Sequence, residues 1–577
     1  MRRWTAVAVL LVVVGVAATL TFEWLGRPTH EVVDPAGAHG GRGNSEIPQG
    51  HIYTGIAAEP RNLNPFTTSE ATVRSYVLGL THEGLFDYDP QTGELRGALA
   101  ESWEVADDGS SMTVTLRRDV RFADGSPLTM EDVLFTHQVL SNDAVVPGSV
   151  VDGMALVERV EPVAGEPWRL RIDFDRRHFA AAAVVGTSWL VVHKDWFLER
   201  VAELAAADGR PVPQPGDQGF GLLLSRVEQS PGPGTGPYRF SDDPLAPSWR
   251  RGRGLTLRRN PYAWSREARP GTWNLGGVRL LFLTDQAASY TALVGREIDW
   301  YSSPGSGQLL SQRPALADDY KQLVYDGPTV GVFMVQWNCQ REHLRDRRVR
   351  RALSMLFDRE VIAERILAGH ALPAVAFARP GSPGYPEDLA PPGGGGPQEV
   401  RRLVRAAGFD PANGAPLRIE LLTPAGAPWY RRMAELARGA AVDAGIDLQV
   451  REVAFELLVQ RRAGEDWDGV LLMNSLDRHG DPYELLHSEG AGNVMSWHHP
   501  DADRWIDELR GAADPKVRGA LLGRLHRLVH EEQPVALLVH PLVAILFNRH
   551  IRGATPGPLG LWPERFWVAI DHQRSER

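Results

Sequence analysis

The stretch from Thr81 to Leu140 constrains the fold of this chain more than any other, because its local signals are dense and mutually consistent. Asp107-Asp108-Gly109 supplies the left-handed backbone that a tight hairpin turn needs. Apolar and polar residues then alternate from Met112 to Leu116, which predicts a half-buried strand. Thr129 is placed to begin a helix, and Asp132 is spaced to hydrogen-bond back to the helix N-terminus. The stretch therefore predicts a strand, a hairpin turn, a second strand, a turn and a helix.

The length and charge of the chain limit its fold and its partners. A chain of 577 residues exceeds what one hydrophobic core organises, so we expect two or three lobes. The net charge of -10 argues against a nucleic-acid partner, because phosphate binding needs a basic surface. The single cysteine, Cys339, cannot form an internal disulfide, and we expect it to be a small buried residue rather than a nucleophile.

The N-terminus has the pattern of an export signal. Arg2 and Arg3 precede an uncharged apolar run from Thr5 to Phe22, which is long enough to cross the hydrocarbon layer of a membrane. No cysteine stands directly after this run, which excludes the bacterial lipoprotein route, and bulky residues stand where a cleavage site would need small ones. We predict a signal peptide or, preferably, a retained single-span anchor over residues 1–24, followed by a flexible tether over 25–50.

Two segments of the opening stretch carry a resemblance to a known family. They read Leu-Ala-Glu-Ser-Trp-Glu-Val-Ala-Asp-Asp-Gly from Leu99 and Leu-Arg-Arg-Asp-Val-Arg-Phe-Ala-Asp-Gly-Ser-Pro-Leu-Thr-Met-Glu-Asp-Val from Leu116. This wording resembles the signature of the family 5 extracellular solute-binding proteins, the peptide-, dipeptide- and nickel-binding receptors of ABC importers. The segment from Arg345 to Glu360 resembles the second signature of that family. The resemblance extends over nearly the whole exported body, from Ile52 to Trp567.

The resemblance implies an α/β fold of the periplasmic-binding-protein type (type II, cluster C), with two main lobes, an inserted third lobe and a hinge between lobes. Two crossing strands would act as the hinge, one near Val324–Val335 within the apolar strand segment Leu323–Asn338 and the other near Ala536–Ala544. On the family pattern, lobe I is discontinuous, lobe II is inserted early and lobe III late. The implied boundaries are 51–86, 231–326 and 537–577 for lobe I, 87–230 for lobe II, and 327–536 for lobe III.

The loop after a predicted strand at Trp467–Met473 is the candidate binding segment, because ligands of α/β sheets gather beyond the carboxyl ends of strands. In the resembled peptide binders, this loop carries a buried Asp that pairs with the ligand's N-terminal amine, and neighbouring backbone groups pair with the peptide. Asp477 is the better positional match for that acid, whereas Asp481 matches the family's acid before proline. The alternative is that both acids only cap the turn and the next helix. The implied ligand-binding residues are Glu59, at the start of a segment that borders the cleft in the family, and Asn474, Ser475, Leu476, Asp477 and Asp481.

Other chemistries find little support in the sequence. His479, His487, His498 and His499 invite a metal site, but no Cys or carboxylate spacing around them matches a known metal motif. The Gly393–Gly396 run lacks the Lys-Ser/Thr of a phosphate loop, and no G-x-S-x-G nucleophile elbow occurs. We therefore expect no enzyme activity, no cofactor and no metal site in the protein.

The function that the resemblance implies is that of an extracytoplasmic substrate-binding receptor of an ABC importer. We expect a monomer that encloses a peptide between lobes I and III and presents the closed form to a permease and ATPase complex. It would lie in the periplasm or on the outer face of the cytoplasmic membrane. Two alternatives stay open. One is the same fold binding a nickel chelate, an opine or an oligosaccharide, and the other is a membrane-tethered sensor that no longer transports.

Overall fold

The computed structural model describes most of the chain after its N-terminal segment. The described residues are 49–56, 59–68, 70–145, 154, 156–241, 247–283, 286–302, 310, 313–326, 331–392, 396–464, 466–476, 479–557 and 560–568. The predicted anchor at 1–24 lies outside these residues, as does all but the end of the predicted tether at 25–50. Within the described ranges, no helix combines the length and apolar character that crossing a membrane requires.

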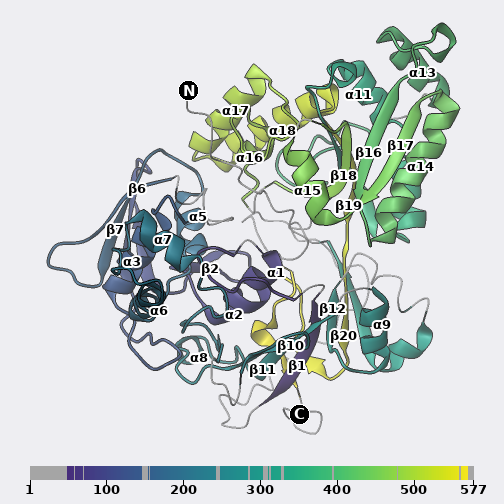
Figure 1. Cartoon of the computed structure of the whole chain (residues 1–577). Helices are drawn as coiled ribbons and strands as arrows, with labels where there is room; N and C mark the ends of the chain where they lie inside the picture. The colour runs from purple at the N-terminus through teal and green to yellow at the C-terminus, as the bar shows by residue number, and fades with distance from the viewer. Residues whose placement is uncertain are drawn as a thin grey trace.

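The largest sheet has eight strands, which come from distant parts of the chain. Its order is β13-β20-β12-β1-β11-β10-β8, with β9 paired to β10. The strands are β1 (Gln49–Ile56), β8 (Tyr238–Arg239), β9 (Trp249–Arg250), β10 (Gly254–Arg259), β11 (Leu275–Phe282), β12 (Trp300–Ser302), β13 (Tyr320–Tyr325) and β20 (Val543–Asn548). Strand β1 lies near the centre and runs parallel to both of its neighbours, β11 and β12. Figure 1 shows this sheet in the lower part of the molecule, beside α9 (Gln286–Val294).

A second sheet has six strands and is covered by helices on both faces. Its order is β15 (Ala371–Pro373), β19 (Val535–Pro541), β14 (Val332–Trp337), β18 (Gly469–Asn474), β16 (Arg418–Pro424) and β17 (Asp447–Val453). One face packs against α11 (Arg347–Ser354), α13 (Gly396–Ala406) and α14 (Pro428–Ala444). The other face packs against α15 (Phe455–Ala463), α16 (Tyr483–Leu486), α17 (Pro500–Gly511) and α18 (Pro515–Glu532). The alternation of strand and helix that the sequence shows in this region therefore builds a two-sided α/β layer.

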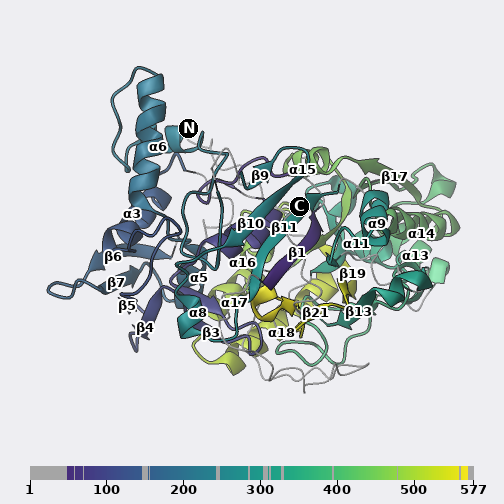
Figure 2. The same ribbon diagram turned by 90° about the horizontal axis from the view of Figure 1, so that it is seen from below.

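A third, antiparallel sheet has four strands in the order β4 (Ala100–Val105), β5 (Ser111–Leu116), β7 (Arg169–Phe174) and β6 (Val157–Pro162). It shares a hydrophobic core with α3 (Met130–Leu140), α5 (Ala181–Ser188), α6 (Lys194–Ala207) and α7 (Gln218–Leu224). Figure 2 shows this unit at the opposite end of the molecule from α13 and α14. The predicted hairpin between β4 and β5 is confirmed, and Gly109 adopts the left-handed backbone with φ 68°. The capping box of α3 is also confirmed, since the Thr129 amide donates to Asp132 Oδ2 at 2.8 Å.

Short elements connect these sheets. They are the β2 (Phe86–Tyr88) and β3 (Leu95–Gly97) hairpin, the β21 (Ile551–Arg552) and β22 (Trp567–Val568) pair, and the helices α1 (Ala71–Val73), α2 (Gly79–Thr81), α8 (Ser265–Ala268) and α12 (Arg359–Val361). Two π-helical turns span Arg74–Leu78 and Ile362–Ile366, and 3₁₀ turns span Pro314–Asp318, Glu342–Leu344, Pro411–Asn413 and Pro563–Arg565.

Two segments join the eight-stranded sheet to the six-stranded sheet. The first lies between β13, which ends at Tyr325, and β14, which begins at Val332. The apolar run at Leu323–Asn338 is therefore not one strand: its two parts belong to different sheets. In the second, β19 ends at Pro541 and β20 begins at Val543. We call these two segments the first and second crossing.

The second crossing lies a few residues after the predicted boundary at 536. Residues Val535–Pro541 stay with the six-stranded sheet because they form strand β19, which pairs with β14 on one side and β15 on the other. All seven are buried. Only after Leu542 does the chain pair with β12 and β13 in the eight-stranded sheet. The lobe boundaries themselves stay a prediction.

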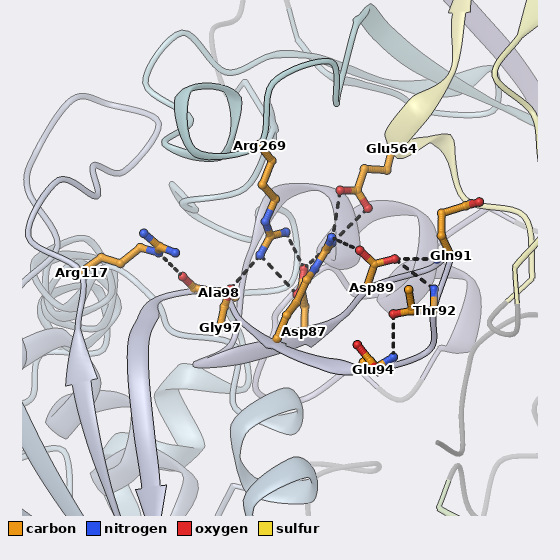
Figure 3. A network of polar contacts seen from close by, with 11 residues as sticks. Asp87, Asp89, Gln91, Thr92, Glu94, Gly97, Ala98, Arg117, Arg269 and Glu564 are labelled. Atoms are coloured by element: carbon orange, nitrogen blue, oxygen red, sulfur yellow. Dashed lines mark hydrogen bonds and ion pairs between the residues drawn. The ribbon is translucent and has the colours of Figure 1, made fainter. Parts of the chain in front are cut away.

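A polar network fixes the β2–β3 hairpin against the C-terminal part of the chain (Figure 3). The Arg96 guanidinium contacts the carboxylates of Asp87 at 2.7 Å, Asp89 at 3.3 Å and Glu564 at 3.0 Å. Arg269 adds a second cation, because its Nη1 donates to Asp87 Oδ2 at 2.9 Å. The network therefore joins three parts of the chain that are far apart in sequence, and it does so where the four-stranded unit leaves the eight-stranded sheet.

One carboxyl group near this network predicts a dependence of stability on pH. Burial raises the pKa of Glu83 to about 7, although the Trp264 indole donates a hydrogen bond to its carboxylate at 2.8 Å. The folded protein therefore keeps this proton up to about pH 7, whereas the unfolded chain releases it near the ordinary Glu value. The free energy of unfolding should fall by roughly 3 kcal/mol as the pH rises through this range. The variant Glu83→Gln should lose this component in urea unfolding measured from pH 5 to 8.

The matched control for this measurement is Glu104→Gln, which changes an exposed side chain on β4. It should leave the pH dependence of the wild type unchanged. If the Glu83→Gln protein showed the same pH dependence as the wild type, the assignment of a raised pKa to Glu83 would be wrong.

Candidate functional site

The loop that follows β18 carries the polar groups that the sequence indicates as a site. Asn474 ends the strand and pairs with Val332 of β14. Its side chain is buried, and its Oδ1 accepts a hydrogen bond from the Ser475 amide at 2.9 Å. Its Nδ2 donor has no hydrogen-bond partner among the residues that the structure describes. Since a buried unsatisfied donor costs about 1–3 kcal/mol, this amide is a ready partner for a carbonyl or carboxylate oxygen.

The next two residues of the same loop differ in their exposure to solvent. Ser475 is exposed, and Leu476 is partly buried against the hydrophobic cluster on this face of the six-stranded sheet. Asp477, the better match to the anchor acid, lies outside the described residues. The sequence prediction for these residues is not tested by the geometry and stays a prediction.

Asp481 is buried and strongly engaged within the protein. Its Oδ2 lies 3.1 Å from His178 Nε2 and accepts a hydrogen bond from Arg510 Nε at 2.8 Å. Its Oδ1 accepts from the amide of Tyr483, the first residue of α16, at 3.0 Å. Burial alone raises the pKa of this carboxyl, but the hydrogen bond to His178 and the positive charge of Arg510 outweigh it, so the pKa lies below its usual range. The carboxylate is therefore ionised, and the charge on Arg510 already balances it.

Glu59 follows β1 of the eight-stranded sheet, and its carboxylate is also bound by other residues of the protein. Its carboxylate accepts hydrogen bonds from Trp249 Nε1 at 2.9 Å and from the Gly252 amide at 3.1 Å. Arg251 Nη1 lies 3.7 Å away. These contacts hold the turn between β9 and β10. Glu59 thus supports the edge of the eight-stranded sheet, and the contacts do not bring it together with Asp481.

The histidines near the loop make separate contacts. The His479 Nδ1 lies 3.4 Å from the Tyr88 hydroxyl, and the His487 ring stacks on Tyr483 with centroids 4.3 Å apart. The His499 Nδ1 accepts a hydrogen bond from the Asp501 amide at 3.2 Å and caps α17. Within the described part of the chain, no group of three or more His, Cys, Asp or Glu side chains is arranged to hold a metal ion.

Cys339 follows β14 and packs, partly buried, against the hydrophobic cluster of the six-stranded sheet. Burial raises the pKa of its thiol to about 11. The thiol is therefore protonated at neutral pH, and it lacks the thiolate character that a nucleophile or a metal ligand needs. The residue behaves as the small, mainly apolar side chain that the sequence predicts.

Both crossings meet at one buried side chain. Arg379 follows β15, and its guanidinium forms an ion pair with Asp326, the first residue after β13. Its Nη2 also donates to the Pro541 carbonyl at the end of β19, at 3.1 Å. The amide of Leu542 in the second crossing donates to the His370 carbonyl at 2.9 Å. One guanidinium therefore binds both segments that join the two large sheets.

Sequence reasoning missed the partners of Asp481 and the role of Arg379. His178 is 303 residues from Asp481 in sequence, and Arg510 is 29 residues away, so no local spacing connects them. The one available signal for Arg379 is its place just after a short strand, which many surface arginines share. Only the folded arrangement identifies these side chains as contacts between units.

Three sheets with two crossings form the cluster C fold of extracytoplasmic binding proteins. The structure matches oligopeptide-binding protein AppA of Bacillus subtilis in complex with a nonapeptide, with a TM-score of 0.73 and 20% identity over 91% of this chain and 100% of that one. It also matches NikZ of Campylobacter jejuni in complex with Ni(L-His), with a TM-score of 0.71 and 18% identity over 89% of this chain and 97% of that one.

The sequence comparisons define the family. A model of the bacterial extracellular solute-binding proteins, family 5 (Middle), matches residues 94–495, and the chain belongs to this family. Among curated relatives, AppA of B. subtilis is 22% identical over 90% of this chain and 92% of its own length. The predicted family and fold are therefore confirmed. The protein is a solute-binding protein and not an enzyme.

The Arg379 contacts yield a prediction for stability. Replacement of Arg379 by Met removes the partner of Asp326 and leaves the Pro541 carbonyl without this donor. Since the guanidinium is buried, we expect the free energy of unfolding to fall by about 2 kcal/mol or more in urea titration. Arg296→Met serves as the control, because its ion pair with Asp319 is exposed and should contribute less than about 1 kcal/mol. Equal effects of the two variants would contradict this reading of the crossings.

Proposed function

We propose that the protein is the receptor of an ABC importer and that it captures peptides outside the cytoplasm by closing its lobes. In this proposal the eight-stranded, four-stranded and six-stranded units are lobes I, II and III, and the two crossings are the hinge. The observation that carries the proposal is the polar loop after β18, where Asn474 leaves a buried donor unused beyond the carboxyl end of a central strand. The relatives named as oligopeptide- and dipeptide-binding proteins support the ligand class.

The mode of binding follows from what an extended peptide offers. Its backbone presents amide donors and carbonyl acceptors at regular intervals, so backbone pairing gives affinity without selecting side chains. Asn474 Nδ2 would donate to one such carbonyl, and the amide and carbonyl groups near Ser475 and Leu476 would extend the pairing. The ligand's N-terminal ammonium would need a carboxylate partner in a site from which water is excluded.

Of the two candidate acids, we propose Asp477 as the partner of the ligand's ammonium. The carboxylate of Asp481 already accepts hydrogen bonds from Arg510 and the Tyr483 amide, and His178 lies within bonding distance. A ligand cation would have to displace these buried partners. Asp477 matches the family's anchor position in sequence, so it is the better proposal.

Peptide binding can be tested with a panel of di- to nonapeptides, measured by thermal shift and isothermal titration calorimetry. We expect at least one length class to bind, and Asp477→Asn to weaken that binding by about tenfold or more, because the variant removes a charge-assisted hydrogen bond. Asp501→Asn, an exposed change on α17, should bind as the wild type does. N-terminal acetylation of the peptide should weaken binding to the wild type and should have little effect on Asp477→Asn.

The same panel should contain nickel with free histidine, an opine and an oligosaccharide. These ligands represent the other solutes that the fold accommodates, as NikZ with Ni(L-His) illustrates. Binding of one of them, together with no response to any peptide, would replace the peptide proposal with that solute. Binding of none, by a protein that is folded and monomeric, would favour a sensor that no longer transports.

We also propose that residues 1–24 are retained as an anchor on the outer face of the cytoplasmic membrane. The support is the apolar run that starts at Thr5, its basic start and the bulky residues after it. Mass spectrometry of the protein from its own membranes should find a chain that begins at or near Met1. A mature N-terminus near residue 25, with the protein in the soluble fraction, would contradict this proposal.

A further inference from the structure

A buried ionic cluster joins the four-stranded unit to the six-stranded unit. His178 lies between β7 and α5 of the four-stranded unit, whereas Asp481 and Arg510 belong to the loop after β18 and to the end of α17. The distances to Asp481 Oδ2 are 3.1 Å from His178 Nε2 and 2.8 Å from Arg510 Nε. Relative exposures are 7% for His178 and 6% for Asp481, so both side chains are removed from water. Removal of one partner would leave the other buried and unpaired, so it should cost more than the loss of a surface ion pair.

Further contacts surround the cluster and also cross between the two units. The Phe179 amide donates to the Arg510 carbonyl at 2.9 Å, which adds a backbone bond. The guanidinium of Arg518, on α18, lies 4.8 Å from the centroid of the Phe179 ring. At a second point, the Tyr88 hydroxyl of the β2–β3 hairpin lies 3.4 Å from His479 Nδ1. Figure 1 shows α5 and α17 facing each other across this region.

The chain path makes these contacts depend on conformation. The four-stranded unit continues at both ends into strands of the eight-stranded sheet, β1 before it and β8 after it. The six-stranded unit is joined to the eight-stranded sheet by the two crossings. The bonds from His178 and Phe179 therefore exist only while the two units are held together, and any opening at the crossings that separates them must break these bonds.

We infer that His178, Asp481 and Arg510 form a latch that holds lobe II against lobe III and fixes the Asp481 end of the loop after β18. The naming of the lobes and of this loop rests on the proposed function, but the latch itself does not require that the ligand be a peptide. Arg510 orients the Asp481 carboxylate within lobe III, and His178 recognises it from lobe II. Asp481 is thus a positioning residue, whose carboxylate is engaged by the protein itself rather than by the ligand.

With this latch, lobe II also influences the balance between the open and closed forms of the protein. A latch that acts on closure adds free energy to the closed state only, so it shifts the balance between open and closed forms before any ligand arrives. It should therefore slow ligand release more than it changes the rate of capture. The latch also fixes one end of the loop after β18, because a single carboxylate makes two contacts. Its Oδ1 accepts from the Tyr483 amide at the start of α16, and its Oδ2 contacts His178.

Single-molecule energy transfer in ligand-free protein tests the latch. The single cysteine is first removed with Cys339→Ser, and labels are placed on Leu222→Cys in α7 and Val442→Cys in α14, whose exposures are 57% and 68%. In this background, we expect His178→Gln and Asp481→Asn each to raise the ratio of open to closed molecules about tenfold, because a buried hydrogen bond to a charged group is lost. The double variant should add little to the larger single effect, since both changes break one contact.

The control is Asp501→Asn, which removes an exposed ion pair with Arg504 on the same helix as Arg510 and should leave the distances unchanged. Circular dichroism shows which variants are folded, and His178→Gln leaves lobe III untouched should Asp481→Asn fail to fold. Distance distributions that stay those of the wild type in folded His178→Gln protein would overturn the latch. Failure to bind peptides would not affect this result, because the measurement contains no ligand; where a ligand is found, its dissociation rate should rise in the same variants.

Discussion

The two crossings between the eight-stranded and six-stranded sheets are the constraint on which the rest of the structure depends. On one side β13 and β20 pair with each other, and on the other side β14 and β19 pair with each other. Each crossing therefore leaves one hydrogen-bonded strand and enters another, with a short segment between. Arg379 binds both segments at once, through Asp326 and the Pro541 carbonyl. Relative motion of the two large sheets has to be absorbed at these few residues.

Because the two large sheets are joined only by the two crossings, a contact between units can affect the balance between conformations. A contact within one sheet unit stabilises that unit in every conformation. A contact between units that are linked only through the crossings stabilises one conformation against others. The bond between His178 and Asp481 is of the second kind, whereas the network around Arg96 fixes the four-stranded unit to the eight-stranded sheet where the chain passes from one to the other. Polar contacts with carboxylates therefore have two roles in this protein. The Arg96 network joins two units permanently, whereas the His178–Asp481 contact forms and breaks with conformation.

The carboxylates of the site show why part of it could not be predicted. Sequence motifs identify the loop after β18, because the position of an acid relative to a strand and a proline is a local pattern. They do not distinguish an acid that is left for a ligand from one that is consumed by the protein. Asp481 has the family position before Pro482, but its partners come from a loop 303 residues earlier and from the end of α17. Glu59 likewise holds the β9–β10 turn through Trp249 and Gly252, contacts that its own motif does not indicate.

Elements whose causes are local could be predicted from the amino-acid sequence. The hairpin at Gly109, the capping box of Thr129 and Asp132, and the alternation of strands and helices in the six-stranded unit follow from backbone preferences and from the period of apolar residues. The family motifs then determined the fold class. The family motifs also placed a crossing in the apolar run at Leu323–Asn338, and the folded structure shows where that run divides into β13 and β14. The roles of Arg379 and Asp481 as contacts between units came from the tertiary structure. These outcomes depend on packing and charge neutralisation between segments that are from 29 to 303 residues apart, where no spacing along the chain encodes which partners will meet.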